Sequence, residues 1–564
     1  MSTSENQVHE ESLWFGTAER PLFGRLTSPL TGTSLGGVLL SPPIGREARL
    51  ARRCLRSLAI LLAMDGYVTL RFDHFATGNS SGTFEDDGFD CAWSEGVNQA
   101  TALLRSLGLS SVSAVGMRMG ATIIGAAAAE YDLELASAVM WDPCESGRTY
   151  LRESSALGGF GREIEAPASS VPVKMLEYVY SDDAATRMSA VNLFAPTLGP
   201  LAQRVLMVVR DDRVISSKFR TRWFEQVEWE TTSDQGPLLE TELPSSVQPT
   251  STIARIREWL TVPESLATPY QVESRAPDKV VVMAPNAYPV RERFVQLGPH
   301  KLFGVLSEPV GEVRGPLIVM VSGINEDHVG PSRLWVELSR RWAGVGLRCA
   351  RFDLRELGES PWLPGQPNPP AFDKTRPDDI HDAVNALSPT DSSDSVLIGL
   401  CSGAQLALGA ALEFKSRGVC IINPQVGTGL LRTADRLDKS DRPSIRSFMQ
   451  RCETLLKRHR WVGQMVRQVS RLVLSTATSP KVRKTLARNE TEMLLLASPG
   501  DFSPFPWMPI IGTIDARRLV SSEHFRVEVI SGMDHDFLSD VGRDRAVDIL
   551  ERHVREKFSV APSD

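Results

Sequence analysis

Residues 395–412 read SVLIGLCSGAQLALGAAL: an apolar run, then G-L-C-S-G, then small residues. The apolar run predicts a buried strand, and the residues after the glycines favour a helix. A strand, a G-x-nucleophile-x-G turn and a helix together form a nucleophile elbow, in which glycines permit a sharp backbone turn. Cys401 stands at the apex of this turn, where such motifs usually carry serine.

An elbow of this kind predicts covalent chemistry at Cys401. The backbone N–H of Ser402 is expected to point toward an oxyanion, and the helix beginning there favours a thiolate. A second oxyanion donor is expected from the loop after the strand at 316–322, with the N–H of Ile324 as first candidate and Asn325 as the next.

A nucleophile needs a base, and the elbow predicts an acid after one later strand and a histidine after the next. Asp501 follows the β-rich run at 492–498, and His535 follows the run at 525–531. Asp534 and Asp536 flank the histidine, but they would need an unusual turn to reach its ring. By itself, G-L-C-S-G is equally a glycine-rich turn around a buried thiol, and the correctly ordered acid and base favour catalysis.

The chain repeats itself at a distance of one domain. LFGRLTSP at 22–29 matches LFGVLSEP at 302–309, and GYVTLRFDHFATGNS at 66–80 matches GLRCARFDLRELGES at 346–360. Each recurring residue lies 280 positions after its counterpart, as from Phe23 to Phe303. A period of this length indicates two copies of a whole domain and not a solenoid.

Within each copy, short apolar β-rich runs alternate with amphipathic helical segments. This alternation predicts the α/β class, with a mostly parallel sheet covered by helices on both faces. We expect a first domain over 1–262, a Pro-, Ser- and Thr-rich linker over 263–285, and a second domain over 286–564. A helical cap insert is expected near 425–490.

The first copy lacks the nucleophile and the base that this reaction needs. Its elbow, G-M-R-M-G, carries Arg118, and a protonated guanidinium cannot act as a nucleophile. Asp211 remains at the acid position, but no histidine follows Arg213 in this copy. Arg118 is expected either to bind an anion in a vestigial pocket or to pair with Asp73 or Asp211. His74 is expected at the surface or at the pocket mouth.

The insert at 425–490 is basic and carries apolar residues at roughly helical spacing. It is either a solvated helical face or a docking face for an anionic partner, such as coenzyme A, a carrier protein, a nucleotide-linked substrate or an anionic membrane. His328 and Arg333, within NEDHVGPSRLW, either line the substrate entrance or cap the helix that begins near Pro331.

Bulk composition excludes several classes. The chain has 564 residues, a net charge of −7 and seven scattered cysteines without C-x-x-C spacing. This argues against nucleic-acid binding, a disulfide framework and a zinc site, and no metal or cofactor is predicted. No run of about 18 apolar residues exists, and the polar start MSTSENQVHEES lacks a secretory pattern, so we expect a cytoplasmic location.

Both halves resemble the α/β-hydrolase superfamily, in its serine-aminopeptidase or monoacylglycerol-lipase-like branch. The first half is similar to exosortase- and exopolysaccharide-associated hydrolases through RFDHFATGNSSG, GMRMGA and WDPCESGRTYLRE, and the second is similar to another branch through NEDHVGPSRLWVELSRRW, RFDLRELGES and GLCSGA. The resemblance implies two tandem α/β-hydrolase domains and an ester, thioester or amide hydrolase or an acyltransferase, mostly with serine as nucleophile. Polyhydroxyalkanoate synthases also carry G-x-C-x-G on this fold, as an analogy of chemistry only.

The leading hypothesis is acyl transfer through an S-acyl intermediate on Cys401, with a transferase slightly favoured over a hydrolase. The expected partner is an acyl-donor substrate, with linkage to coenzyme A or to a carrier protein as candidate forms. The alternatives are a (thio)esterase with water as acceptor, carbon-centred chemistry of the dienelactone type, and a non-catalytic scaffold in which both copies are degenerate.

Overall fold

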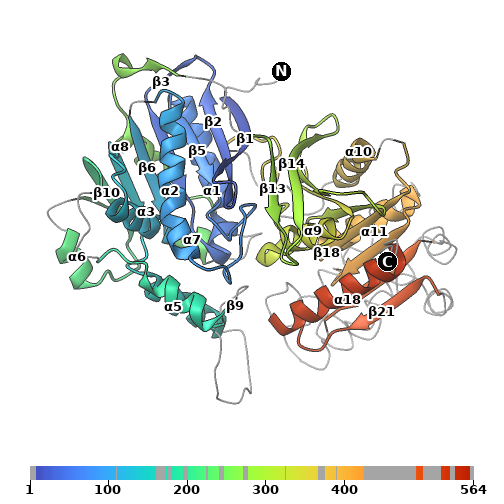
Figure 1. Ribbon diagram of the computed structural model, residues 1–564. Helices are drawn as coiled ribbons and strands as arrows, with labels where there is room; N and C mark the ends of the chain where they lie inside the picture. The colour runs from blue at the N-terminus through green and yellow to red at the C-terminus, as the bar shows by residue number, and fades with distance from the viewer. Residues whose placement is uncertain are drawn as a thin grey trace, which may run out of the picture.

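The computed structural model describes most of the two predicted domains (Figure 1). The described residues are 8–109, 111–159, 173–174, 179–194, 201–223, 227–240, 247–270, 277–323, 326–365, 375–388, 390–424, 491–498, 523–533 and 540–558. The predicted cap insert, Asp501 and His535 lie outside them, as do Ile324 and Asn325.

The first half is built on an eight-stranded sheet. Its strands, in spatial order, are β1 (Val8–Gly16), β2 (Pro21–Pro29), β5 (Val68–Phe72), β4 (Gly37–Ser41), β6 (Val112–Met117), β7 (Ser137–Trp141), β10 (Arg204–Arg210) and β11 (Glu228–Thr232). The pairings β1–β2 and β2–β5 are antiparallel, and every pairing from β5 onward is parallel.

The second half is built on a nine-stranded sheet. Its strands, in spatial order, are β13 (Lys279–Met283), β14 (Pro289–Leu297), β15 (Leu302–Pro309), β17 (Arg348–Phe352), β16 (Leu317–Val321), β18 (Ser395–Leu400), β19 (Gly418–Ile422), β20 (Glu492–Ala497) and β21 (Phe525–Val529). From β14 onward this order reproduces that of the first sheet strand for strand. The two halves therefore share one topology, with β13 as an extra strand.

Helices cover the sheets in both halves (Figure 1). In the first half they are α1 (Gly45–Met64), α2 (Phe89–Ser106), α3 (Met119–Glu130), α4 (Gly147–Gly159), α5 (Asp182–Ala190), α6 (Ser217–Trp223), α7 (Gly236–Leu239) and α8 (Thr250–Leu260). In the second half the described ones are α9 (Leu334–Gly344), α10 (Arg376–Leu387), α11 (Ser402–Phe414) and α18 (Asp540–Phe558).

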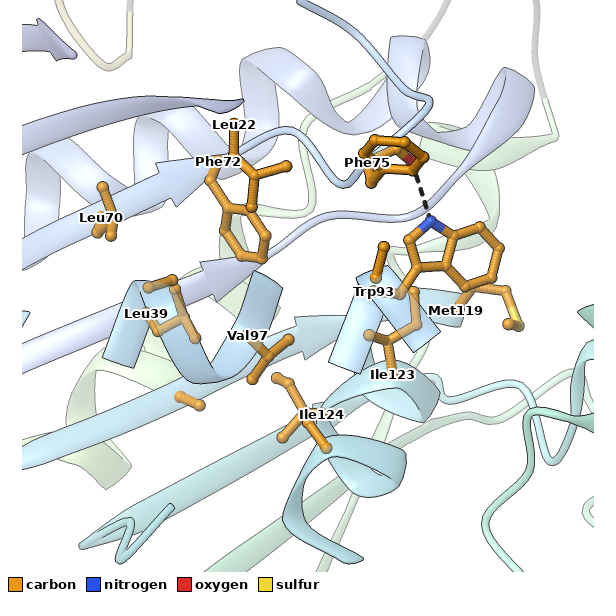
Figure 2. Close-up of a cluster of buried hydrophobic side chains, with 14 of the residues drawn as sticks. Leu22, Leu39, Leu70, Phe72, Phe75, Trp93, Val97, Met119, Ile123 and Ile124 are labelled. Carbon is orange, nitrogen blue, oxygen red and sulfur yellow. Dashed lines mark hydrogen bonds between the residues drawn. The ribbon is translucent and has the colours of Figure 1, made fainter. Parts of the chain in front are cut away.

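The central strands, such as β18, are mostly apolar and fully buried because helices cover both faces of the sheet there. Leu397 and Ile398 are neighbours in β18, yet they belong to two different core clusters, one on each face. Figure 2 shows one such cluster in the first half, where Trp93 packs beside Ile123 and donates its indole N–H to the carbonyl of Phe75 at 3.0 Å. The predicted α/β class, with mostly parallel sheets between helices, is confirmed.

Parts of the predicted linker form short strands. Helix α8 ends at Leu260, and within the range 263–285 a short strand, β12 (Thr268–Pro269), pairs with β3 (Thr33–Ser34) of the first half. Strand β13 in the same range belongs to the second sheet. None of the helices that the structure describes is long and apolar enough to cross a membrane.

Candidate active site

Cys401 lies between the end of β18 and the first residue of α11, with φ 54° and ψ −118°. Its N–H donates to the carbonyl of Ile422 at 2.9 Å, and its side chain is half-buried. A positive φ at a non-glycine residue costs about 1–3 kcal/mol and persists only where the surroundings enforce it. Such strain is common at functional sites, and the elbow predicted from the sequence has this geometry.

Two glycines make the elbow possible. A Cβ on Gly399 would lie 2.3 Å from the carbonyl oxygen of Gly403, and a Cβ on Gly403 would lie 2.4 Å from that of Val321. Neither position has room for a side chain. The close contact brings the beginning of α11 against the end of β16, where the predicted oxyanion loop starts.

The described part of the oxyanion region consists of Ser402 and the beginning of the loop after β16. Ser402 is buried and is the first residue of α11, so its N–H points out of the N-terminal end of the helix. A Cβ on Gly323 would lie 3.2 Å from Ser402 Oγ. The loop therefore passes directly beside the elbow.

The strands that precede the predicted acid and base lie in the expected order. β18, β19, β20 and β21 are successive neighbours in the sheet, all parallel. Asn423, at the end of β19, accepts a hydrogen bond from the N–H of Ser498 at 2.7 Å. The chain that leads to Asp501 thus leaves the sheet at the carboxyl ends of the strands, where Cys401 also lies.

Arg118 occupies the elbow of the first half, with φ 54° and ψ −122°. Its N–H donates to the carbonyl of Trp141 at 2.9 Å, as Cys401 does to its own neighbouring strand. Gly116 and Gly120 are again too close to backbone atoms to carry a side chain. The two elbows therefore differ in their apical side chain and not in their backbone.

Three carboxylates surround the Arg118 guanidinium, which is 2% exposed. Its nitrogens lie 3.0 Å from Glu47 Oε1, 3.3 Å from Asp142 Oδ2 and 2.6 Å from Glu153 Oε2. Burial opposes the charged form, yet the surrounding negative groups raise the pKa of Arg118 above its ordinary value. Arg118 thus has an ion-pair role, but its partners are neither Asp73 nor Asp211. Asp211 is exposed.

His74 is fully buried, so the prediction of a surface or mouth position is wrong. Its Nε2 lies 3.1 Å from Ser41 Oγ, and its ring packs edge-on against Phe72. Burial lowers its pKa to about 3. The sequence placed His74 on a loop, but the loop folds inward and the ring joins the core.

His328 and Arg333 lie at the contact between the two halves. His328 is fully buried, with Nδ1 2.8 Å from Asp353 Oδ2 and Nε2 2.9 Å from the Asn79 side chain of the first half. Arg333 donates to carbonyl oxygens of the first half, including those of Gly78 at 2.8 Å and Gly82 at 2.6 Å. Neither side chain caps α9.

The recurring motif R-F-D…G-x-S folds into the same loop in both halves. Asp73 accepts from the N–H of Asn79 at 2.8 Å, and Asp353 accepts from that of Glu359 at 2.7 Å. In each copy the loop serine donates to the carbonyl of its aspartate, at 2.6 Å in the first and 2.8 Å in the second. These loops build the contact between the halves, a role that the sequence analysis missed. The sequence carried a signal for it, because the motif recurs in the copy that has no nucleophile.

Arginines from each half bind the loop of the other. Arg56 of α1 donates to the carbonyls of Gly358 at 2.7 Å and Ser360 at 2.8 Å, and Arg340 of α9 donates to that of Ser80 at 3.1 Å. Helix α1 thus contacts the second loop as α9 contacts the first. The contact is isologous, as in a two-fold symmetric dimer.

Among the described residues, no group of His, Cys, Asp and Glu side chains forms a metal site.

Comparison with known proteins agrees with this geometry. Residues 318–552 match the profile described as "Alpha/beta hydrolase family". No curated protein sequence matches the chain.

Several solved structures are similar to part of this chain. Est1E from Butyrivibrio proteoclasticus is 13% identical, over 44% of this chain and 97% of that one, with a TM-score of 0.33. An esterase from Pyrococcus furiosus is 16% identical, over 45% and 90%, with a TM-score of 0.31. A dienelactone hydrolase from Anabaena variabilis is 14% identical, over 48% and 98%, with a TM-score of 0.30. The profile match covers most of the second half, the half that carries the Cys401 elbow and the nine-stranded sheet.

Proposed function

We propose that the second half is a cysteine-dependent acyl-transfer enzyme with Cys401 as nucleophile, His535 as base and Asp501 as the acid that orients the histidine. The observation that carries this proposal is the strained, half-exposed Cys401 at the tip of the elbow, beside the beginning of α11. Its thiol is partly exposed, whereas those of Cys54, Cys144, Cys349 and Cys420 are buried.

In the first step, Cys401 Sγ attacks the carbonyl carbon of an ester, thioester or amide, and His535 takes the thiol proton. The N–H groups of Ser402 and of the loop after β16 would stabilise the negative charge that develops on the carbonyl oxygen. The bond to the leaving group then breaks, and His535 returns the proton to that group. The product is an S-acyl enzyme.

In the second step, an acceptor gives its proton to His535 and attacks the thioester carbonyl. The tetrahedral intermediate expels Cys401 as thiolate, which His535 reprotonates. Water as acceptor gives a hydrolase, and an alcohol, amine or thiol gives an acyltransferase. We favour transfer, because an S-acyl enzyme stays reactive enough to pass its acyl group to an acceptor in a site that excludes water.

The first half, in this proposal, is a degenerate copy that arose by tandem duplication. The shared strand order, the two matching elbows and the repeated loops support it. Arg118 and its three carboxylates fill the place where a substrate would react.

Turnover of p-nitrophenyl esters and acyl-coenzyme A tests the proposal. Cys401→Ala and His535→Ala are expected to abolish turnover, and Asp501→Asn is expected to lower it more than Asp534→Asn or Asp536→Asn does. Cys91→Ala is the matched control, because Cys91 is an exposed thiol on α2. Unchanged turnover in Cys401→Ala would contradict the proposal and favour a scaffold.

A further inference from the structure

We propose that the first half has a function of its own: it holds residues 326–333 of the second half, in the loop that leaves β16 beside the Cys401 elbow. In this role Arg52, Arg49 and Asn79 are positioning residues that act on the second half's active site from the first. The inference rests on the proposed function, since it concerns the oxyanion donors of that reaction.

The loop is anchored to the elbow at its near end. Ser322, the first residue after β16, donates its hydroxyl to the carbonyl of Asp327 at 2.9 Å. A Cβ on Gly323 would lie 3.2 Å from Ser402 Oγ and 3.4 Å from Glu326 Oε2. Glu326 and Asp327 therefore contact the part of the loop that lies beside the elbow.

First-half arginines hold both of these carboxylates. Arg52 Nε lies 2.6 Å from Asp327 Oδ2, and Arg49 Nη1 lies 3.6 Å from Glu326 Oε1. The four side chains are between 10% and 17% exposed, so solvent screens these ion pairs weakly. Both arginines are on α1, whose helical backbone fixes their spacing.

His328 and Arg333, further along the loop, also contact the first half. His328 N–H donates to Asp353 Oδ1 at 2.6 Å, and its ring lies between Asp353 and Asn79. Beyond it, Arg333 binds carbonyl oxygens along the first half's loop at 76–82. From Glu326 to Arg333, the loop is fastened to the first half at every few residues.

These contacts break the symmetry between the halves. In the first half only residues 42–44 separate β4 from α1, whereas in the second half residues 322–333 separate the equivalent elements β16 and α9. The longer loop belongs to the half with Cys401, and it is the loop that reaches α1 of the other half. The offset of 280 residues holds on both sides of this segment, so the loop is longer because α9 begins later than α1 does. Simple stabilisation of a two-fold contact would not need this difference.

Small displacements of this loop are expected to matter. Oxyanion donors act at 2.7–3.1 Å from the developing charge. A misplacement of about 1 Å in a catalytic arrangement lowers a rate by roughly 100-fold. Removing Arg52 leaves Asp327 buried beside the elbow without its cation, and the loop is expected to shift.

Two reactions of the same sulfur, followed on the full-length chain, separate positioning from folding. Acylation of Cys401 by p-nitrophenyl acetate needs oxyanion stabilisation, whereas alkylation by iodoacetamide does not. For Arg52→Met we expect acylation to fall by about 10- to 100-fold, with alkylation within about twofold of wild type. Arg52→Lys keeps the charge and is expected to recover most of the acylation rate.

Arg53→Met is the matched control. Arg53 is the next residue of α1 and also reaches the second half, but it binds the Glu356 carbonyl at 3.1 Å and covers the Trp362 ring. Both reactions should keep wild-type rates in this variant. If Arg52→Met does not fold, Asn79→Ala is expected to give the same split between the two reactions.

Wild-type acylation in folded Arg52→Met, or an equal loss of acylation and alkylation, would overturn the inference. A wild-type chain that forms no adduct on Cys401 would contradict the proposed function, and with it this inference. If Cys401 is acylated at the same rate in the wild-type chain and in the Arg52 variants, the inference is contradicted and the proposed function is not.

Discussion

Arg118 and Cys401 share one backbone conformation, with φ 54° at both residues and ψ −122° and −118° respectively. The turn that presents a nucleophile in the second half has therefore survived intact in a half where the apical side chain cannot react. Its glycines lock the turn by backbone contact, so its geometry does not depend on the residue it presents.

Arg118→Ser is expected to restore no activity, because no histidine follows in the first half to act as a base. The variant should be less stable by about 3–5 kcal/mol, since Glu47, Asp142 and Glu153 lose a buried partner. Urea unfolding measures the loss. Esterase activity that persists when Cys401 is also replaced would refute this reading of the first half.

Cys401→Gly is expected to make the protein more stable and inactive. Glycine adopts a positive φ without strain, so relief of the elbow conformation should raise the unfolding free energy by roughly 1 kcal/mol. The same urea experiment detects it, with Cys91→Gly as a comparison in the first turn of α2, where glycine should destabilise. A Cys401→Gly chain that is clearly weakened would show that the turn is not strained.

His74 should make stability depend on pH. Its pKa is lowered by burial to about 3 from an ordinary value of 6.5, so the unfolded chain binds a proton that the folded chain does not. Stability contributed by neutral His74 is present above pH 6.5 and falls as the pH drops toward 3. At pH 5 this loss is about 2 kcal/mol. His74→Gln should show a smaller difference in unfolding free energy between pH 7 and pH 5, and an equal difference would contradict the assignment.

Glu359→Gln is expected to weaken the contact between the halves. Glu359 of the second half is buried, and its carboxylate accepts hydrogen bonds from both terminal nitrogens of Arg71 of the first half, at 2.9 Å and 2.7 Å. Burial alone would raise the pKa of Glu359, but Arg71, Arg56 and Arg25 hold it well below its ordinary value. Loss of this charge should cost about 3–5 kcal/mol.

Glu356→Gln provides its control, because Arg53 donates to the backbone carbonyl of Glu356, which the substitution keeps. If the two glutamine variants unfold at the same urea concentration, Glu359 does not hold the halves together as described.

Much of the architecture could be predicted from the sequence. The recurrence of residues such as Gly78 and Gly358 at a fixed distance predicts two copies of one domain, and G-L-C-S-G predicts the elbow, because glycine spacing and apolar runs are local signals. The described strands follow this pattern from β14 to β21.

The partners of buried charges could not be predicted in the same way. Arg118 pairs with Glu47 and Glu153, and Arg52 pairs with Asp327 of the other half, across separations that no local pattern records. His328 and Arg333 stand in a motif beside the expected oxyanion donor. Only the packing of the halves shows that they contact the first half.

Intact-mass measurement after incubation with an activated ester or acyl-coenzyme A tests the central claim most directly. The account predicts one added acyl group in the wild-type chain, mapped to the peptide that contains Cys401, and none in Cys401→Ala. An acyl group of the same stoichiometry that persists in Cys401→Ala would contradict it.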